Sequence, residues 1–260
     1  MTHQTGDGTV LARRAIDNGY DLVMVYGGDG TLLDVAQGML DQDVPMGILP
    51  GGTANALAEE LRIPMKLAAA ARLVCENKIH FRSIDVGKVG EHYFLVRIGT
   101  GMIATLSEGV TRDLKDRFGL GAYFISGITA LKQPQYVTYT LTIDGKTIQT
   151  EGAACLVTNG NSFGLLRMTI SQHIHVDDGL LDVFILNTDL QTIVGLASSI
   201  AGIEKGMVSL QHWQGRSITI ETNPPQRIFA DGENTPIGMT PCTIEIVPNA
   251  LQVVVPELHH

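Results

Sequence analysis

Two glycine-rich segments constrain the fold of this chain more than any other feature of its sequence. Residues 27–31 (GGDGT) follow an apolar run at residues 21–26, and residues 50–55 (PGGTAN) close a second apolar run that begins at residue 46. Short apolar runs that end in glycine are typical of buried parallel strands. Helical patterns follow both segments, at residues 31–40 and 53–61. Repeated strand–glycine–helix units predict an α/β domain with a parallel sheet.

Beyond residue 81 the pattern changes from alternating helix and strand to successive strands. The sequence before that point predicts two more helices, at residues 9–18 and 67–76. The strands expected after it are residues 83–88, 92–98, 136–143, 146–149, 153–158, 181–186, 217–221, 226–230, 243–247 and 251–255. Two helical stretches interrupt them, at residues 104–132 and 191–205, and Asp144-Gly145 is a strong hairpin signal.

These patterns predict two domains, which is also the usual expectation for a chain of 260 residues. The first is a Rossmann-like parallel α/β domain of residues 1–84, completed by residues 250–260. The second is a mainly antiparallel β-sandwich domain of residues 85–249.

Composition excludes several classes of protein. The net charge of −9 argues against nucleic-acid binding, since nucleic-acid binders usually carry a basic face. No apolar run is long enough to span a bilayer, and the N-terminal residues lack the pattern of a signal peptide. Three widely spaced cysteines fit buried thiols in a reducing compartment. We therefore expect a cytoplasmic protein, with peripheral membrane contact and a homo-oligomer left open.

Both glycine-rich segments are suited to binding phosphate. Glycine lets the backbone approach a phosphate closely, and the following helix presents unpaired N–H groups and the positive end of its dipole. Asp29 could orient a reacting hydroxyl or hold a metal ion, while the alternative is a plain turn capped by Thr31. Two such turns at the carboxyl ends of neighbouring strands form a cleft where open α/β sheets bind ligands. We expect nucleotide contacts at Gly27, Gly28, Asp29, Gly30, Thr31, Gly52, Thr53 and Asn55.

Five segments, in order along nearly the whole chain, resemble the diacylglycerol kinase and sphingosine kinase superfamily. They are the two glycine-rich segments, Ile84-Asp85-Val86-Gly87-Lys88, Asp178-Gly179-Leu180-Leu181-Asp182-Val183, and Asp231-Gly232-Glu233 followed by Pro248-Asn249-Ala250-Leu251. The resemblance implies a lipid kinase that uses ATP and magnesium to phosphorylate a hydroxyl of a diacylglycerol-like or sphingoid-like lipid.

The resemblance also implies roles for residues outside the glycine-rich segments. Thr2 resembles a further nucleotide contact. Glu233 looks like the general base that takes the proton of the lipid hydroxyl, a task that suits a carboxylate. Its alternative reading is an ordinary turn residue, because Asp-Gly is turn chemistry.

Asp178 looks like a magnesium ligand, with the backbone carbonyls of His175 and Leu180 completing its turn. Its alternative reading is a hairpin residue. Asp85 could join the metal network through water or cap the end of a strand. Asp177 reads as a solvated neighbour of Asp178.

The chain also departs from the family pattern, and other functions remain open. Compared with the family, it starts just before the second helix, without the first strand and the Asn-Pro-containing glycine loop. Ala56 stands where many diacylglycerol kinases have Asp, a form closer to sphingosine kinases. One alternative is a kinase that acts on NAD, because NAD kinases share the GGDGT turn. Another is a non-catalytic nucleotide- or lipid-binding protein.

The basic and aromatic stretch at residues 111–131 could lie on a membrane and admit a lipid tail. An ordinary amphipathic helix packed on the sandwich is the alternative.

Overall fold

The computed structural model describes residues 6–76, 79–101, 136–161, 174–187, 211–230 and 236–257. The two helices expected at residues 104–132 and 191–205, the 111–131 stretch, Thr2 and Glu233 lie outside these ranges.

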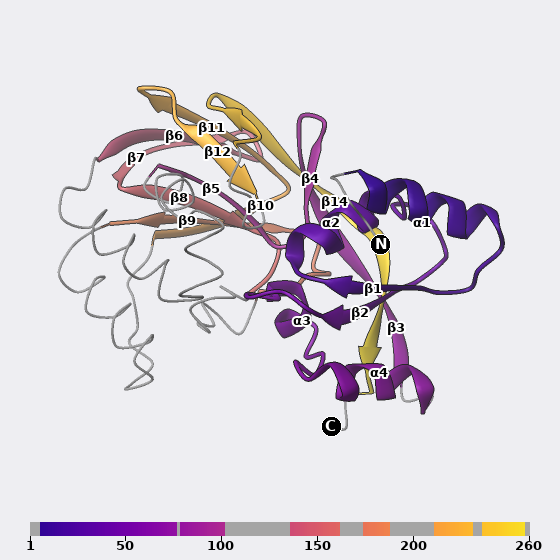
Figure 1. The fold of residues 1–260 in the computed structure, drawn as a ribbon. Helices are drawn as coiled ribbons and strands as arrows, with labels where there is room; N and C mark the ends of the chain where they lie inside the picture. The colour runs from indigo at the N-terminus through magenta and orange to yellow at the C-terminus, as the bar shows by residue number, and fades with distance from the viewer. Residues whose placement is uncertain are drawn as a thin grey trace, which may run out of the picture.

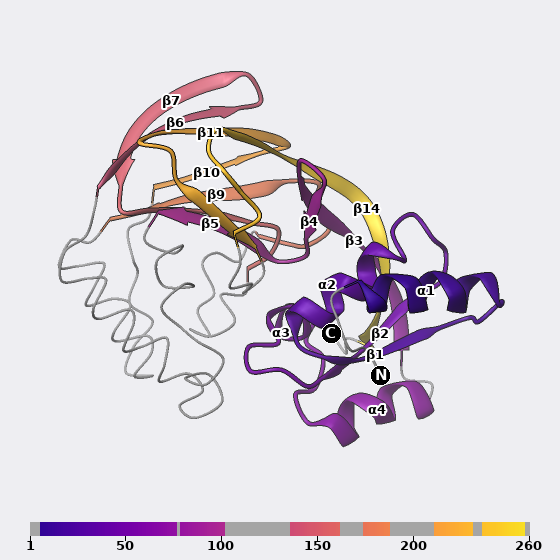
Figure 2. The ribbon, with the colours of Figure 1, turned by 45° about the horizontal axis from the view of Figure 1, so that its top comes forward.

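The N-terminal part alternates helix and strand as predicted. Its elements are α1 (Asp7–Asp17), β1 (Val23–Gly27), α2 (Asp29–Gln37), β2 (Met46–Pro50), α3 (Ala56–Glu60) and α4 (Leu67–Cys75). Strands β1 and β2 are parallel, with Val23 opposite Met46 and Gly27 opposite Pro50. Helices α1 and α2 lie on one side of these strands and α4 on the other (Figures 1 and 2), while Met24 and Tyr26 of β1 remain exposed. The parallel α/β fold is therefore confirmed.

The described strands, β1 and β2 included, form two sheets. The eight-stranded sheet has the order β1-β2-β14-β11-β6-β7, with β3 paired to β14 and to β4. Its further strands are β3 (Ile79–Val89), β4 (His92–Phe94), β6 (Val137–Ile143), β7 (Lys146–Gly152), β11 (Ser217–Asn223) and β14 (Cys242–Pro256).

The second sheet is antiparallel, with the order β10-β9-β8-β5-β12-β13. Its strands are β5 (Arg97–Gly101), β8 (Ala154–Thr158), β9 (Leu181–Leu186), β10 (Gln211–Gly215), β12 (Arg227–Ala230) and β13 (Gly238–Met239). Figure 2 shows β6 and β7 lying above β9 and β10, as two layers. One apolar cluster, which includes Phe94, Leu141, Val183 and Ile244, joins the two layers, so the predicted sandwich is confirmed.

Strands β3 and β14 run through both parts of the molecule. The first half of β14 pairs with β11, and its second half reaches β2, where Val253 lies opposite Met46. The two long strands pair with each other on both sides of a bulge between Val247 and Leu251. Pro248 lies in that bulge, where its missing N–H breaks no regular ladder. The predicted boundaries near residues 85 and 249 fall within these continuous strands.

Several strand predictions differ from the structure, among them residues 243–247 and 251–255, which were expected as two strands and form the single strand β14. Residues 92–98 form two strands, because the chain passes from the first sheet to the second between Phe94 and Arg97. Strands β10 and β13 were not predicted, since β10 is largely exposed and polar and β13 has two residues. The hairpin at Asp144-Gly145 forms as predicted, with positive φ at both residues. No helix within the described ranges is both long and apolar enough to cross a bilayer.

Candidate functional site

The two glycine-rich turns lie against each other at the carboxyl ends of β1 and β2. The Gly51 N–H donates a hydrogen bond to the Gly27 carbonyl (2.9 Å). A Cβ placed on Gly52 would lie 2.5 Å from the Cα of Gly28, so the two backbones approach more closely than side chains permit. The predicted pair of adjacent turns is therefore present, and a ligand-binding cleft beside them stays a prediction.

Asn55 shapes the second turn from within. Its Oδ1 accepts the Gly52 N–H and its Nδ2 donates to the Gly52 carbonyl, both at 2.8 Å. Its φ of 50° is left-handed, a region that Asn tolerates better than most residues. These contacts give Asn55 a structural role, and its nucleotide contact stays a prediction.

Asp29 begins α2 and links the first turn to the helix after the second. Its Oδ1 accepts the Leu57 N–H of α3 at 3.2 Å. The next residue, Gly30, is exposed, and a Cβ built on it would meet no atom within 4 Å. Gly52 and Thr53 are exposed as well. The start of α2 therefore presents a helix N-terminus to open space, which fits a phosphate group.

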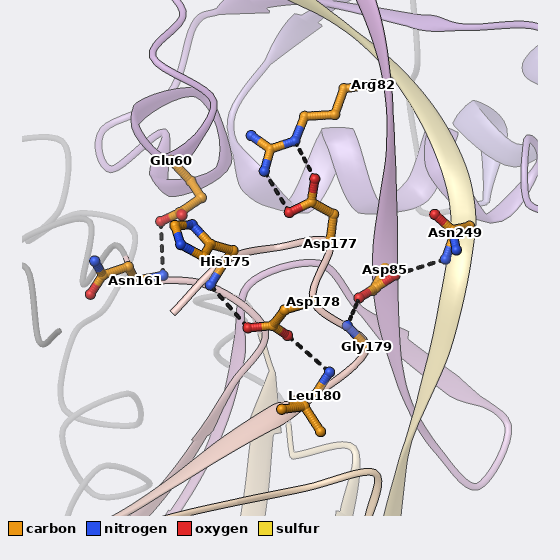
Figure 3. Close-up of polar contacts among 10 residues, drawn as sticks. All are labelled: Glu60, Arg82, Asp85, Asn161, His175, Asp177, Asp178, Gly179, Leu180 and Asn249. Carbon is orange, nitrogen blue, oxygen red and sulfur yellow. Dashed lines mark hydrogen bonds and ion pairs between the residues drawn. The ribbon is translucent and has the colours of Figure 1, made fainter. Parts of the chain in front are cut away.

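Residues 175–180 form a tight turn before β9, which we call the 175–180 turn (Figure 3). Asp178 accepts the Leu180 N–H on Oδ1 (2.9 Å) and the His175 N–H on Oδ2 (3.3 Å). Partial burial raises the pKa of Asp178, and the negative charge of Asp85 raises it further. The structure thus brings together all four of the predicted metal-site residues, His175, Asp178, Leu180 and Asp85.

Asp85 is buried and holds three segments together. Its Oδ2 accepts the Gly179 N–H and its Oδ1 accepts the Asn249 N–H, both at 2.7 Å. Its own N–H donates to the Val176 carbonyl (2.7 Å), and Asn159 Nδ2 donates to its carbonyl. Asp85 therefore joins β3, the bulge of β14 and the 175–180 turn. This structural role was not predicted, and a link from Asp85 to a metal ion stays a prediction.

Asp177 is exposed, as expected of a solvated neighbour, but it is also paired with Arg82. Its carboxylate forms a two-pronged ion pair with Arg82, at 2.5 Å from Nη2 to Oδ1 and 2.7 Å from Nε to Oδ2. The hydrogen bond from Arg82 lowers the pKa of Asp177, and the same bond raises the pKa of Arg82. The sequence could not show this pair, because 95 positions separate the two residues.

The short helix α3 follows the second glycine-rich turn, and its last residue, Glu60, contacts the segment after β8. Glu60, at the end of α3, accepts the Asn161 N–H (2.9 Å) in the segment after β8. A Cβ on Gly160 would lie 2.9 Å from Val176 and 3.2 Å from Glu60, so these segments pack tightly. Because α3 has five residues, it spans about 7.5 Å. The segment after β8 thus lies between the end of α3 and Val176 of the 175–180 turn.

Asp178 offers the kind of oxygen ligand that magnesium prefers, and a magnesium ion bound there stays a prediction. Magnesium prefers carboxylates and carbonyl oxygens and retains several waters or phosphate oxygens. Within the described ranges no three His, Cys, Asp or Glu side chains converge on one point. A metal ion here would therefore depend on Asp178, backbone carbonyls and the phosphates of a nucleotide.

Two family models together match most of the chain. Residues 1–89 match the diacylglycerol kinase catalytic domain, and residues 97–255 match the YegS C-terminal NAD kinase beta sandwich-like domain. The meeting point lies after β3, where the chain enters the second sheet.

Individual proteins give the same result. A Staphylococcus haemolyticus protein named "Putative lipid kinase" is 33% identical over 90% of this chain and 76% of its own length. A Staphylococcus aureus protein of the same name is 32% identical, again over 90% of this chain and 76% of its own length. A Bacillus anthracis crystal structure described as "a putative diacylglycerol kinase" has a TM-score of 0.79 and 28% identity, and the match covers 98% of this chain and 82% of that one. The chain therefore belongs to the lipid kinase family in which a diacylglycerol kinase catalytic domain is joined to a YegS-type β-sandwich domain.

Proposed function

We propose that this protein transfers the γ-phosphoryl group of ATP to a hydroxyl group of a lipid. The observation that carries the proposal is the pair of glycine-rich turns with its open helix start at Gly30, joined through α3 and the segment after β8 to the 175–180 turn. The family membership agrees with it. Phosphoryl transfer needs mostly positioning and charge neutralisation, and this arrangement offers both.

In the proposed reaction the phosphates of ATP lie against the start of α2 and the exposed second turn. Asp178 and its neighbouring carbonyls would hold magnesium, whose positive charge would offset the phosphate charge. Glu233 accepts the proton of the lipid hydroxyl as its oxygen attacks the γ-phosphorus. The bond to the bridging oxygen breaks, ADP leaves, and the proton finally passes from Glu233 to water.

The location of the proposed lipid substrate determines where the enzyme acts. A lipid substrate would bring it to a membrane surface from the cytoplasm, as a peripheral protein. The net charge of −9 disfavours adhesion to anionic lipid by total charge alone. The proposal therefore needs local contacts with the membrane.

One experiment tests the function and its alternatives together. ATP consumption is measured against diacylglycerol, sphingosine, phosphatidylglycerol, an isoprenol and NAD. We expect turnover with one of the lipids. Turnover with NAD alone would instead favour the NAD kinase alternative, which the NAD kinase-like description of the C-terminal domain keeps relevant. ATP binding without turnover on any acceptor would favour a binding protein.

The role of Glu233 is tested by Glu233→Gln, which keeps the shape of the side chain and removes its charge. Loss of a positioned base lowers the rate by about 10²–10⁴ while ATP binding survives. If ATP affinity collapses while the rate at saturation is unchanged, Glu233 is a binding residue, and Asp29 is the next candidate for the base.

A further inference from the structure

Strand β3 contacts the 175–180 turn at two places. Along residues 79–86 one edge of β3 pairs with β14. On the other side the Asp85 N–H donates to the Val176 carbonyl, and the Asp85 carboxylate accepts the Gly179 N–H. The second contact is the ion pair between Arg82 and Asp177 (Figure 3). Asp178, the predicted magnesium ligand, lies in the chain between these two points.

The ion pair restrains the turn in a way that one hydrogen bond cannot. Two parallel hydrogen bonds between a planar guanidinium and a carboxylate fix both distance and orientation. Asp177 immediately precedes Asp178, so fixing its side chain limits how the backbone can rotate at the ligand. Both partners are about one-third exposed, so the pair contributes little to folding stability. The two-pronged contact can instead matter to a metal site by fixing the orientation of the turn.

We propose that Arg82 is a positioning residue that acts through Asp177 to hold the turn presenting Asp178, and that it thereby sets the magnesium affinity of the site. The inference rests on the proposed function, since it takes Asp178 as the magnesium ligand. Arg82 belongs to the strand that pairs with β14 beside β2, so the same contact ties the metal ligand to the part of the molecule that carries the glycine-rich turns.

The test must separate geometry from charge, because removing a cation would by itself favour magnesium. Arg82→Lys keeps the charge but loses the planar two-pronged contact. The double variant Arg82→Gln with Asp177→Asn keeps the summed charge of the pair at zero. Arg72→Lys, on the exposed surface of α4, is the matched control.

Magnesium is titrated into each full-length variant by calorimetry, without substrate, and the affinity for an ATP analogue is measured separately. Loss of a residue that orients a metal ligand costs about 10–100-fold in metal affinity. We expect about a tenfold weaker magnesium affinity in Arg82→Lys and in the double variant. The control and the analogue affinity should change by less than about twofold.

Wild-type magnesium affinity in both charge-conserving variants would overturn the inference and leave the proposed function intact. An equal loss of affinity for the ATP analogue would also overturn it, because the pair would then act on the fold as a whole. If the wild-type protein binds no magnesium, the assignment of Asp178 itself fails. Arg82→Lys retains most of the side chain, so it keeps the test valid even if the double variant does not fold.

Discussion

Gly30 is a residue at which folding and ligand binding make opposite demands. It lies in the first turn of α2, is exposed, and has free space where a Cβ would be. Alanine is the better helix former, so Gly30→Ala should raise the free energy of unfolding by about 0.5 kcal/mol. If phosphate approaches this backbone, the same methyl group should weaken ATP binding.

Denaturant titration and ATP titration of Gly30→Ala check this prediction together. Gly238→Ala in β13 is a matched control, because its Cβ also meets nothing within 4 Å and it lies outside both turns. Unchanged ATP affinity in Gly30→Ala would remove Gly30 from the phosphate site.

The three cysteines should differ sharply in reactivity. Cys75 is exposed, whereas burial raises the pKa of the Cys242 thiol to about 11 and raises that of Cys155 still further. The thiolate is the reactive form, and a thiol with so high a pKa stays protonated at pH 8. Native protein should therefore react rapidly with one equivalent of a thiol reagent at pH 8, and unfolded protein with three. Rapid reaction of a second thiol in the native state would contradict the packing of the sandwich.

At the scale of elements, the contact between the two glycine-rich turns makes its own prediction. A methyl group on Gly52 would have to displace the backbone of Gly28 rather than a flexible side chain. Overpacking of this kind typically costs about 1–3 kcal/mol. Gly52→Ala should lower both the unfolding free energy and the ATP affinity, in contrast to Gly30→Ala. Full stability in Gly52→Ala, measured beside the Gly238→Ala control, would show that the turns can separate.

Apolar runs and glycine positions predicted many of the strands and turns, because these local features largely determine where a strand or turn forms. Strands β2 and β9 have the predicted bounds, and the glycine-rich turns lie where the strand–glycine–helix pattern places them. The same patterns could not show that Asp85 would be buried beneath Asn249, 164 positions away, or that Arg82 would pair with Asp177. The first contact depends on the pairing of β3 with β14 and the second on the packing of β3 against the 175–180 turn, and neither arrangement carries a signal in a single sequence. The sequence therefore predicted where the 175–180 turn lies, but it did not predict that Asp85 and Arg82 would bind that turn.

At the scale of the whole molecule, the two parts share strands rather than a linker. Both β3 and β14 begin in one part and end in the other, and each part packs its own apolar cluster against them. Asp85 lies between Ile84 and Val86 of the first cluster, shortly before β3 reaches the second cluster at Val89, and 1% of its surface is exposed. Continuous strands and a buried connecting residue predict that the described parts unfold together in one transition.

Asp85→Asn tests this coupling. The carboxylate accepts two backbone N–H groups, whereas an amide offers one oxygen and turns a donor toward the second N–H. Leaving a buried donor unsatisfied costs about 1–3 kcal/mol. For a protein of this size each kcal/mol lowers the melting temperature by roughly 2–4 °C. Calorimetry should show one transition moved to lower temperature as a whole.

Asp144→Asn is the matched control, because Asp144 also accepts two backbone N–H groups, from Arg216 and Ser217, but is exposed to water. Water can replace a lost hydrogen bond there, and Asn suits the left-handed turn before Gly145, so its melting temperature should hardly change. Two separate transitions in Asp85→Asn would mean that the parts unfold independently once the Asp85 contacts are lost, so the shared strands alone would not couple them. Equal shifts in the two variants would mean that burial of Asp85 contributes nothing, and the role of this carboxylate as the link between the parts would have to be abandoned.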